Sequence, residues 1–248
     1  MSTNFTGRTA IVTGGAQGIG EAVCHSLHAA GANIVIADLN LDRARANLAA
    51  YGERPPMLVA TDVSLEASVT ALYAAVLKQF GQVDIVVNSA GIYRSIPILD
   101  IDAADWDLVL GVNLRGTFLM GREAVRAMKA RGRGRIINVA SIAGKVGSTT
   151  AGAHYAASKA GVINFTKTLA FQAAPFKINV NCVCPGPVAT EMISGWDAER
   201  VKAYAASIPL QQFGQARDIA NAVVFLASDE ASYITGEIVD VNGGLLMD

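Results

Sequence analysis

The chain has 248 residues, of which 52% are hydrophobic and 17% charged, and its formal net charge at pH 7 is −1. High hydrophobicity with almost no net charge excludes an intrinsically disordered chain, and it argues against a nucleic-acid partner because such partners need a basic surface. The mean hydropathy is +0.35, but no apolar run approaches the ~18–20 residues that a spanning helix requires, so we expect no membrane contact.

The amino-terminal residues and the cysteines indicate the compartment. The first residues lack a basic segment followed by an apolar stretch, so we expect no secretory signal. Cys24, Cys182 and Cys184 are too few for a disulfide framework, and no neighbouring ligands complete a metal site. We therefore expect a cytoplasmic protein with buried thiols and no metal.

Segments typical of strands and helices alternate from the first residues to the last. Apolar runs rich in β-branched residues predict strands at residues 8–13, 33–37, 57–61, 83–87, 135–140, 178–183 and 237–241. Helical spacing of apolar residues predicts the intervening helices at residues 18–30, 41–51, 65–80, about 105–131, 154–173 and 218–227. The pattern predicts an α/β fold, a single Rossmann-type doubly wound parallel sheet of about seven strands with helices on both faces. Because no linker or change in composition divides the chain, we expect one dinucleotide-binding catalytic domain over residues 1–248.

A glycine-rich turn follows the first predicted strand and opens the first helix. Gly14, Gly18 and Gly20 give the spacing G-x-x-x-G-x-G, which differs from the usual dinucleotide fingerprint G-x-G-x-x-G. Glycines let the backbone turn tightly and approach a pyrophosphate at the positive end of the helix. A strand-to-helix turn without a ligand could carry the same glycines, so the motif depends on its context.

The second predicted strand supplies that context because it leads into Asp38, 18 residues after Gly20. A carboxylate at this place can accept hydrogen bonds from an adenosine ribose, and it repels a 2′-phosphate. Leu39 beside it supplies no cation, and Gln17 occupies a position where a phosphate-binding arginine or lysine could lie. Asp38 could instead only cap the next helix. Together the features predict NAD rather than NADP.

A tyrosine and a lysine lie one turn apart on the helix predicted for residues 154–173. Tyr155 alone, with an ordinary pKa of about 10, would be a poor base at neutral pH. A cation such as Lys159 stabilises the phenolate and lowers that pKa, so the pair can exchange a proton with an alcohol or a ketone. The spacing by itself is common on helices.

The chain resembles the short-chain dehydrogenase/reductase family over essentially its whole length. The motifs that carry the resemblance occur in order along the chain: residues 13–20, Asp62-Val63, Asn-Ser-Ala-Gly at 88–91, Asn113, Ser141, Tyr155 with Lys159, and Pro-Gly-Pro-Val-Ala-Thr at 185–190. Two positions depart from the family pattern. Ser89 stands where a second asparagine is more frequent, and Ser141 lies fourteen residues before Tyr155, one more than the commonest spacing. We expect both to affect the shape of the substrate pocket.

The resemblance implies a role for each motif. Tyr155 would be the acid/base, Lys159 would stabilise the phenolate and bind the nicotinamide ribose, and Ser141 would donate to the substrate oxygen. Asn113 would hold a water in a proton relay, although it could equally be structural and bond a carbonyl to kink its helix. The dinucleotide would contact the following residues: Gly14, Gln17, Gly18, Ile19, Gly20, Asp38, Leu39, Asp62, Val63, Asn88, Ala90, Gly91, Tyr155, Lys159, Pro185, Gly186, Val188 and Thr190.

The substrate is less constrained by the sequence. Residues 205–210 and 242–244 look like those of 3-oxoacyl-carrier-protein reductases, which normally prefer NADPH, whereas NAD-linked family members often oxidise polyols, sugars or other secondary alcohols. Because Asp38 favours NAD, we expect a small alcohol/ketone substrate. A 3-oxoacyl-thioester reductase and a non-catalytic NAD-sensing regulator remain the alternatives.

The pocket walls and the assembly complete the expectations. Walls would come from residues 92–96 and 142–154 and from a lid at about 190–205, with the following polar or aromatic selectors: Tyr93, Arg94, Lys145, His154 and Trp196. A basic turn, consisting of Lys129, Arg131, Arg133 and Arg135, is expected to be a solvated loop. The helices at 105–131 and 154–173 are apolar around most of their circumference, which is typical of buried helices. The resemblance implies that they pair across subunits in a homotetramer.

Overall fold

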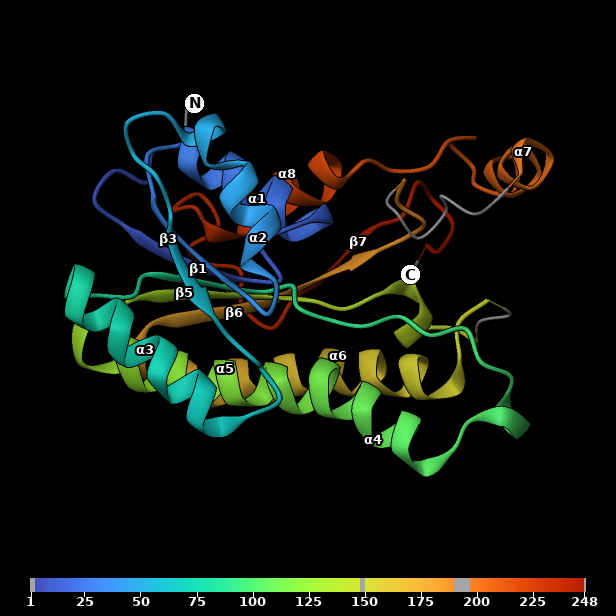
Figure 1. Cartoon of the computed structure of the whole chain (residues 1–248), viewed down its shortest axis with the longest axis horizontal. Helices are drawn as coiled ribbons and strands as arrows, with labels where there is room; N and C mark the ends of the chain where they lie inside the picture. Colours follow the sequence, from blue (N-terminus) through green and yellow to red (C-terminus); the bar gives the residue numbers. More distant parts are fainter. Residues whose placement is uncertain (1–2, 148–149, 190–196, 248) are drawn as a thin grey trace.

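The computed structural model describes residues 3–147, 150–189 and 197–247, and at its centre lies a seven-stranded parallel sheet (Figure 1). The strands are β1 (Thr9–Thr13), β2 (Asn33–Asp38), β3 (Met57–Ala60), β4 (Ile85–Asn88), β5 (Gly134–Val139), β6 (Ile178–Pro185) and β7 (Ile238–Val241). Their spatial order is β3-β2-β1-β4-β5-β6-β7. The order therefore reverses between β1 and β4, where open α/β sheets bind their ligands at the carboxyl ends of the strands.

Helices cover both faces of this sheet. On one side lie α1 (Gly18–Ala29), α2 (Leu41–Ala46) and α8 (Ala216–Ala227), and on the other lie α3 (Glu66–Phe80), α4 (Ala103–Leu110), α5 (Gly116–Met128) and α6 (Ala153–Ala173) (Figure 1). Short turns of other helix types occur at η1 (Leu48–Tyr51), η2 (Ile98–Asp100), η3 (Gly111–Arg115), η4 (Lys129–Arg131), η5 (Ile142–Gly144) and η6 (Ala174–Phe176). The doubly wound architecture confirms the predicted fold class.

Two hydrophobic layers hold the helices on the sheet. Val23 and Leu27 of α1 and Val223 of α8 pack with one face of the strands, all fully buried. Leu72 of α3 and Leu119 of α5 pack with the other face. Because consecutive strand residues point to opposite faces, a parallel sheet covered on both sides needs the continuous apolar strands seen in the sequence.

The long helix predicted at about residues 105–131 is interrupted. It consists of α4, the single π turn η3 and α5, and the amide of Gly116 donates to the carbonyl of Gly111 five residues earlier. Asn113 lies within this turn and is 1% exposed. Single π turns are frequent at functional sites, and apolar periodicity alone does not reveal them because the extra residue shifts the pattern only locally.

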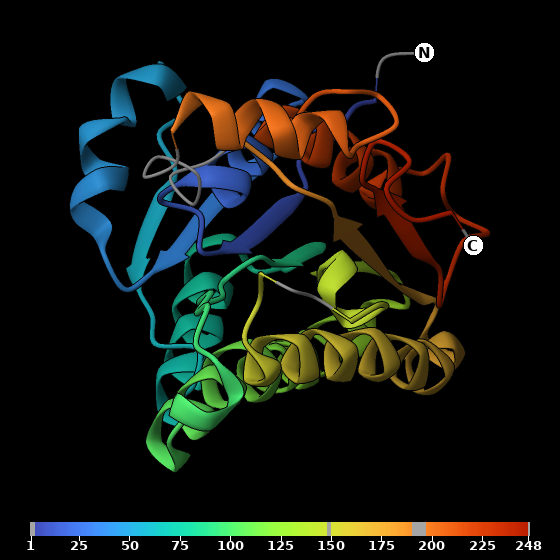
Figure 2. The same cartoon turned by 90° about the vertical axis from the view of Figure 1, so that its right-hand side faces the viewer.

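The carboxyl ends of the strands are flanked by two further elements. The helix α7 (Ala198–Ala206), which was predicted only as part of a lid, and α6 lie on opposite sides of this end of the sheet (Figure 2). Residues 190–196 of the predicted lid lie outside the described residues. Within the part of the chain that the structure describes, no helix has both the length and the apolar character that crossing a membrane requires.

Candidate active site and nucleotide cavity

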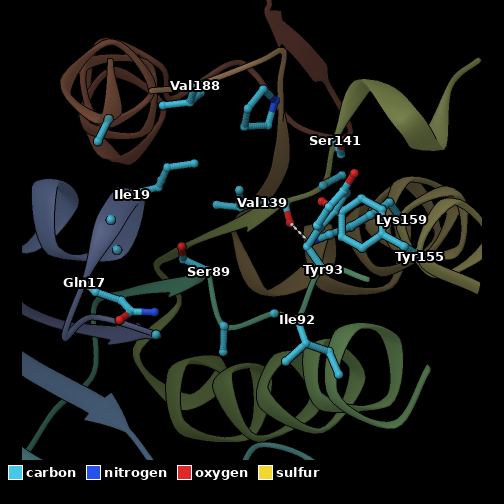
Figure 3. Close-up of a pocket in the computed structure, with 18 of the residues that line it drawn as sticks. Gln17, Ile19, Ser89, Ile92, Tyr93, Val139, Ser141, Tyr155, Lys159 and Val188 are labelled. Carbon is cyan, nitrogen blue, oxygen red and sulfur yellow. Dashed lines mark hydrogen bonds between the residues drawn. The ribbon is translucent and has the colours of Figure 1, made fainter. Parts of the chain in front are cut away.

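One large cavity of about 1480 Å³ runs along the carboxyl ends of the strands. Its walls include the residues that follow successive strands, namely Gly14 after β1, Ser89 after β4, Ser141 after β5 and Gly186 after β6, together with Asp38 at the end of β2. Gln17 and Ile19 lie at one end, and Ser141, Tyr93, Tyr155 and Lys159 gather at the other (Figure 3). The cavity therefore joins the predicted nucleotide turn to the predicted catalytic pair.

The glycine turn is shaped by two close approaches of the backbone. Gly14 has a φ of +65°, and a Cβ there would lie 2.9 Å from the backbone nitrogen of Ala90. A Cβ at Gly20 would lie 2.1 Å from the carbonyl oxygen of Gly14. Any side chain at either position would separate the turn from the helix or from β4. Although the spacing of the glycines is unusual, they allow the same close packing of turn, helix and strand that the common G-x-G-x-x-G fingerprint allows.

The first turn of α1 is open to the cavity. Gly18 has a φ of +58° with nothing within 4 Å of the position that a Cβ would occupy, and Gly18, Ile19 and Gly20 all line the cavity. The side chain of Gln17, which precedes the helix, makes no capping hydrogen bond to it. The amides of a first helical turn have no partners within the helix and attract anions. These residues fit the pyrophosphate of a dinucleotide.

Asp38 has its carboxylate fixed at the end of β2. Its Oδ2 accepts from the amide of Ala16 at 3.1 Å, and its Oδ1 accepts from the amide of Asn40 at 3.0 Å. Asn40, and not Asp38, caps α2 through the amide of Asp42 at 3.0 Å. The alternative that Asp38 merely caps the helix is therefore wrong, and Asp38 lines the cavity.

The sequence did not reveal a cation at this end of the cavity. Arg43, on the first turn of α2, lines the cavity and donates a hydrogen bond through Nη1 to Oε1 of Gln17. Leu39 and Asn40 supply no cation, as predicted, but Arg43, further along α2, brings one to the cavity through its contact with Gln17.

The next segments of the nucleotide wall also lie mostly where they were predicted. Asp62, Val63, Ala90 and Gly91 line the cavity, as do Leu39, Pro185, Gly186 and Val188. Asn88 does not line it: its Nδ2 donates to Oδ1 of Asn138 at 2.8 Å inside the sheet. As the last residue of β4, Asn88 directs its side chain toward β5, whereas the following residues turn into the cavity. Thr190 lies outside the described residues.

At the other end, Ser141, Tyr155 and Lys159 come together. A hydrogen bond links the side chains of Ser141 and Tyr155, and Nζ of Lys159 lies 5.7 Å from the centre of the Tyr155 ring. The Nζ atom donates to the carbonyl oxygen of Val139 at 2.9 Å, the contact drawn in Figure 3. Thus β5 supplies the acceptor that orients the lysine and leads into Ser141, and one face of α6 supplies the other two groups.

Burial dominates the protonation of this pair. It raises the pKa of Tyr155 to about 12, although the hydrogen bond with Ser141 acts in the opposite direction. It lowers the pKa of Lys159 to about 8. The lysine was expected to lower the pKa of Tyr155, but in the protein without its cofactor burial has the larger effect and the net pKa lies above its ordinary value.

Tyr93, in the loop after β4, and Asn113, in the π turn η3, support the catalytic end. The Tyr93 ring meets the Tyr155 ring edge-on, with centroids 5.0 Å apart, and its hydroxyl donates to the carbonyl oxygen of Thr150 at 2.5 Å. Asn113 does not line the cavity. Its side chain accepts from the amide of Ile92 at 2.8 Å and donates to the carbonyl of Ile92 at 3.0 Å and to Oγ of Ser158 at 3.0 Å. Asn113 therefore holds the backbone that leads to Tyr93.

The other predicted selectors of the substrate pocket lie differently. Arg94 forms an ion pair with Asp105, and Lys145 forms one with Asp240, so both cations have acidic partners. His154 is fully buried and does not line the cavity. Trp196 lies outside the described residues. Ser95 and Tyr204, which lie within the predicted wall segments, also line the cavity, as do Phe213 and Leu245, which the sequence did not indicate.

Comparison with known proteins identifies the family. The family model described as enoyl-(acyl carrier protein) reductase matches residues 14–246. Nodulation protein G of Rhizobium sp. (strain N33) is 40% identical over 243 residues, covering 98% of each chain. The 3-oxoacyl-(acyl-carrier-protein) reductase FabG of Escherichia coli (strain K12) is 40% identical over 247 residues, covering 98% of this chain and 99% of the relative. A solved structure from Agrobacterium tumefaciens, provisionally assigned as a gluconate dehydrogenase, is similar with a TM-score of 0.95 at 31% identity and covers 100% of this chain and 99% of that one.

The fold and the cavity define a nucleotide-dependent oxidoreductase that acts on CH–OH or keto groups. The chain belongs to the short-chain dehydrogenase/reductase family, as its motifs predicted.

Proposed function

We propose that the protein is an NAD(H)-dependent oxidoreductase that interconverts a secondary alcohol, such as a polyol, a sugar or a related hydroxy compound, and its ketone. The observation that supports this most directly is the cavity itself. It places the open first turn of α1 and the carboxylate of Asp38 at one end, and Ser141, Tyr155 and Lys159 at the other. A dinucleotide laid along it brings its reactive ring to the proton-transfer groups.

In the proposed mechanism the protein manages one proton. Tyr155, as the phenolate, accepts the hydroxyl proton of the alcohol, or as the phenol returns one to the ketone oxygen. Ser141 donates a hydrogen bond to the same oxygen, and Lys159 stabilises the phenolate and binds the ribose hydroxyls. The bound nicotinamide supplies the hydride chemistry. Because burial raises the pKa of Tyr155 to about 12, the phenolate depends on these partners at neutral pH.

A water beside Gly91 would extend the relay. The Cβ that Gly91 lacks would lie 3.2 Å from Oδ1 of Asn113 and 3.5 Å from Nζ of Lys159. Both polar atoms thus face the side of Gly91 that carries no side chain, and a water bound between them, clear of the Gly91 Cα, could accept from the lysine and donate to the asparagine. We propose this as the role of Asn113, in addition to its hold on Ile92.

NAD remains the proposed cofactor. Asp38 disfavours a 2′-phosphate at the place where its fixed carboxylate lines the cavity. Arg43 would attract that phosphate and so acts against Asp38. An aspartate whose two oxygens are already oriented by main-chain amides cannot turn away, so we expect its repulsion to dominate.

A second candidate substrate class is a 3-oxoacyl thioester, which the name of the Escherichia coli relative favours. Such a substrate reaches the enzyme on an acidic carrier, for which a basic surface would be needed. The arginines of the basic turn have acidic partners within the chain: Arg131 and Arg133 face Asp84, and Arg135 faces Asp229. This pairing supports the alcohol over the thioester.

The test of the mechanism is Tyr155→Phe. We expect turnover to fall by at least ~10³-fold while NAD binding, followed by quenching of protein fluorescence, changes less than ~3-fold. Unchanged turnover would refute the role of Tyr155. A protein that binds NAD but turns over no alcohol, hydroxy acid or 3-oxoacyl thioester with either cofactor would support the sensing alternative instead.

A further inference from the structure

The segment that carries Ser141 is held from two sides. Ser141 precedes the turn η5 and accepts a hydrogen bond from the amide of Ala143 at 3.2 Å. Gly144, at the end of η5, packs on α6 so closely that a Cβ there would lie 2.6 Å from the carbonyl carbon of Lys159. The next residue, Lys145, reaches the other way and places its Nζ 2.5 Å from Oδ2 of Asp240 on β7.

The Lys145–Asp240 pair is more shielded than the other ion pairs on the surface. Its side chains are 13% and 15% exposed, whereas those of Arg45 and Asp42 are 60% and 86% exposed. Exposed pairs contribute little, because water screens them and two long side chains must be ordered. A shielded pair is different, because removing one partner takes a compensating charge away from the other in a poorly hydrated place.

The partner strand β7 is itself part of the frame of the site. It pairs with β6 in the register Cys184↔Asp240 and Pro185↔Val241, and β6 leads into Pro185 and Gly186 of the cavity wall. Lys145 therefore ties the serine segment to the strands that form the wall opposite α6. The contact at Gly144 sets the distance between the Ser141 segment and α6. The Lys145–Asp240 ion pair holds the same segment to β7 of the sheet.

We propose that Lys145 and Asp240 are positioning residues that hold Ser141 in place against Tyr155. The proposal rests on the proposed function, since it presumes that Ser141 and Tyr155 act on the substrate oxygen. Neither residue of the pair touches the cavity. Their effect would therefore be on kcat and not on the binding of substrate or nucleotide, and small displacements of a catalytic group are sufficient for large losses.

The first measurement is the kinetic effect of breaking the pair. For Lys145→Met and for Asp240→Asn we expect kcat to fall about 10- to 100-fold with KM changed less than ~3-fold. The exchange Lys145→Asp with Asp240→Lys should recover at least part of the loss. Arg8→Met is the matched control: it breaks the Arg8–Asp229 pair, which is remote from the cavity, and should leave kcat unchanged.

The second measurement separates positioning from simple electrostatics. The groups that face Tyr155 are Ser141, Tyr93, Cys184 and Lys159, and Cys184 also faces both members of the ion pair. Loss of a positive charge at 145 and loss of a negative charge at 240 would move the pKa of Tyr155 in opposite directions. Loss of the Ser141 hydrogen bond would raise it in both variants. We therefore expect the acid limb of the pH profile for alcohol oxidation to move upward in both, as in Ser141→Ala.

The third measurement is a double-mutant cycle with Ser141→Ala. If the pair acts through Ser141, Lys145→Met should cost less than ~2-fold in the Ser141→Ala background. An impaired Ser141→Ala enzyme in which Lys145→Met costs the same factor as in the wild type would overturn the inference but leave the proposed function intact. A fully active Ser141→Ala enzyme would overturn the proposed function, and the inference with it. Should Lys145→Met not fold, Asp240→Asn takes its place in the cycle with the same expectations.

Discussion

Replacing Lys159 with methionine is expected to stabilise the protein at neutral pH while removing its activity. The lysine is 5% exposed, and its ammonium has one hydrogen bond within the described residues, to the carbonyl of Val139. Burial lowers its pKa from 10.5 to about 8. At pH 7 the amine is therefore still charged in the folded protein, at a cost in folding free energy.

The size of that cost follows from the two pKa values. Each tenfold change in proton affinity corresponds to 1.36 kcal/mol, so holding the charged lysine in this site costs about 3 kcal/mol. Methionine has a similar length and no charge, but it leaves the carbonyl of Val139 without its partner, which costs about 1 kcal/mol. We expect Lys159→Met to raise the free energy of unfolding at pH 7 by about 2 kcal/mol, or roughly 4–8 °C in Tm.

The pH dependence distinguishes this cause from any other. Between pH 8 and 10.5 the unfolded wild-type chain binds the proton more tightly than the folded one, so wild-type stability rises with pH over this window. The variant lacks that rise. The advantage of Lys159→Met should therefore shrink by about 2 kcal/mol between pH 7 and pH 9.5. The ionisation of Tyr155 affects the free energy of unfolding only above this range. Because the pKa of Tyr155 is raised in the folded protein, stability falls as the pH rises from 10 to about 12.

Urea unfolding of the two proteins at equal protomer concentration measures this difference, since assembly would otherwise shift the midpoint. Lys167→Met is the control, because Lys167 is an exposed lysine on the same helix, and its difference from the wild type should not change with pH. A difference between Lys159→Met and the wild type that is the same at pH 7 and pH 9.5 would refute the reasoning.

Three further outcomes are expected. Asp38→Ala should lower the preference for NAD over NADP in kcat/KM by at least ~10-fold, and Arg43→Ala added to it should restore part of the preference; a wild type that already favours NADPH would contradict both. Tyr93→Phe keeps the edge-on ring against Tyr155 but removes the 2.5 Å bond to Thr150, so kcat should fall about 2- to 10-fold, and Tyr93→Ala should cost more than Tyr93→Phe. Phe118 of α5 is 40% exposed and meets Phe165 of α6 edge-on, on the helices expected to pair between subunits, so sedimentation should show a tetramer for the wild type and smaller species for Phe118→Asp.

Local sequence patterns were sufficient to predict the sheet and the strand ends that position this site. The parallel sheet follows from apolar strands alternating with helices, and in such a sheet the strand ends meet at one edge. That is why Gly14, Asp38 and Ser141, far apart in the sequence, could be placed on one cavity. Tyr155 and Lys159 were predictable as a pair because helical spacing alone brings them together.

The features that the sequence did not predict depend on tertiary contacts between residues that lie far apart in the chain. Arg43 reaches the nucleotide end through its hydrogen bond to Gln17, 26 residues earlier in the chain, and no local pattern sets that contact. Asn88 is the last residue of β4, as Asp38 is of β2, but its side chain donates a hydrogen bond to Asn138 and does not line the cavity. The net pKa of Tyr155 was not predictable, because the sequence shows which charge is near but not how much water the hydroxyl loses on burial.

Tertiary contacts that the sequence does not reveal also affect how this enzyme would select its substrate. Arg94 and Lys145 are the basic residues predicted as selectors on the substrate side, and each has an acidic partner within the chain. A carboxylate on the substrate would have to compete with Asp105 or Asp240 for its cation, and winning that competition would break contacts that hold the surrounding loops. Tyr93 and Ser95 can instead contact a neutral hydroxy compound without breaking an ion pair. The arrangement therefore favours selection by shape and neutral hydrogen bonds over selection by charge.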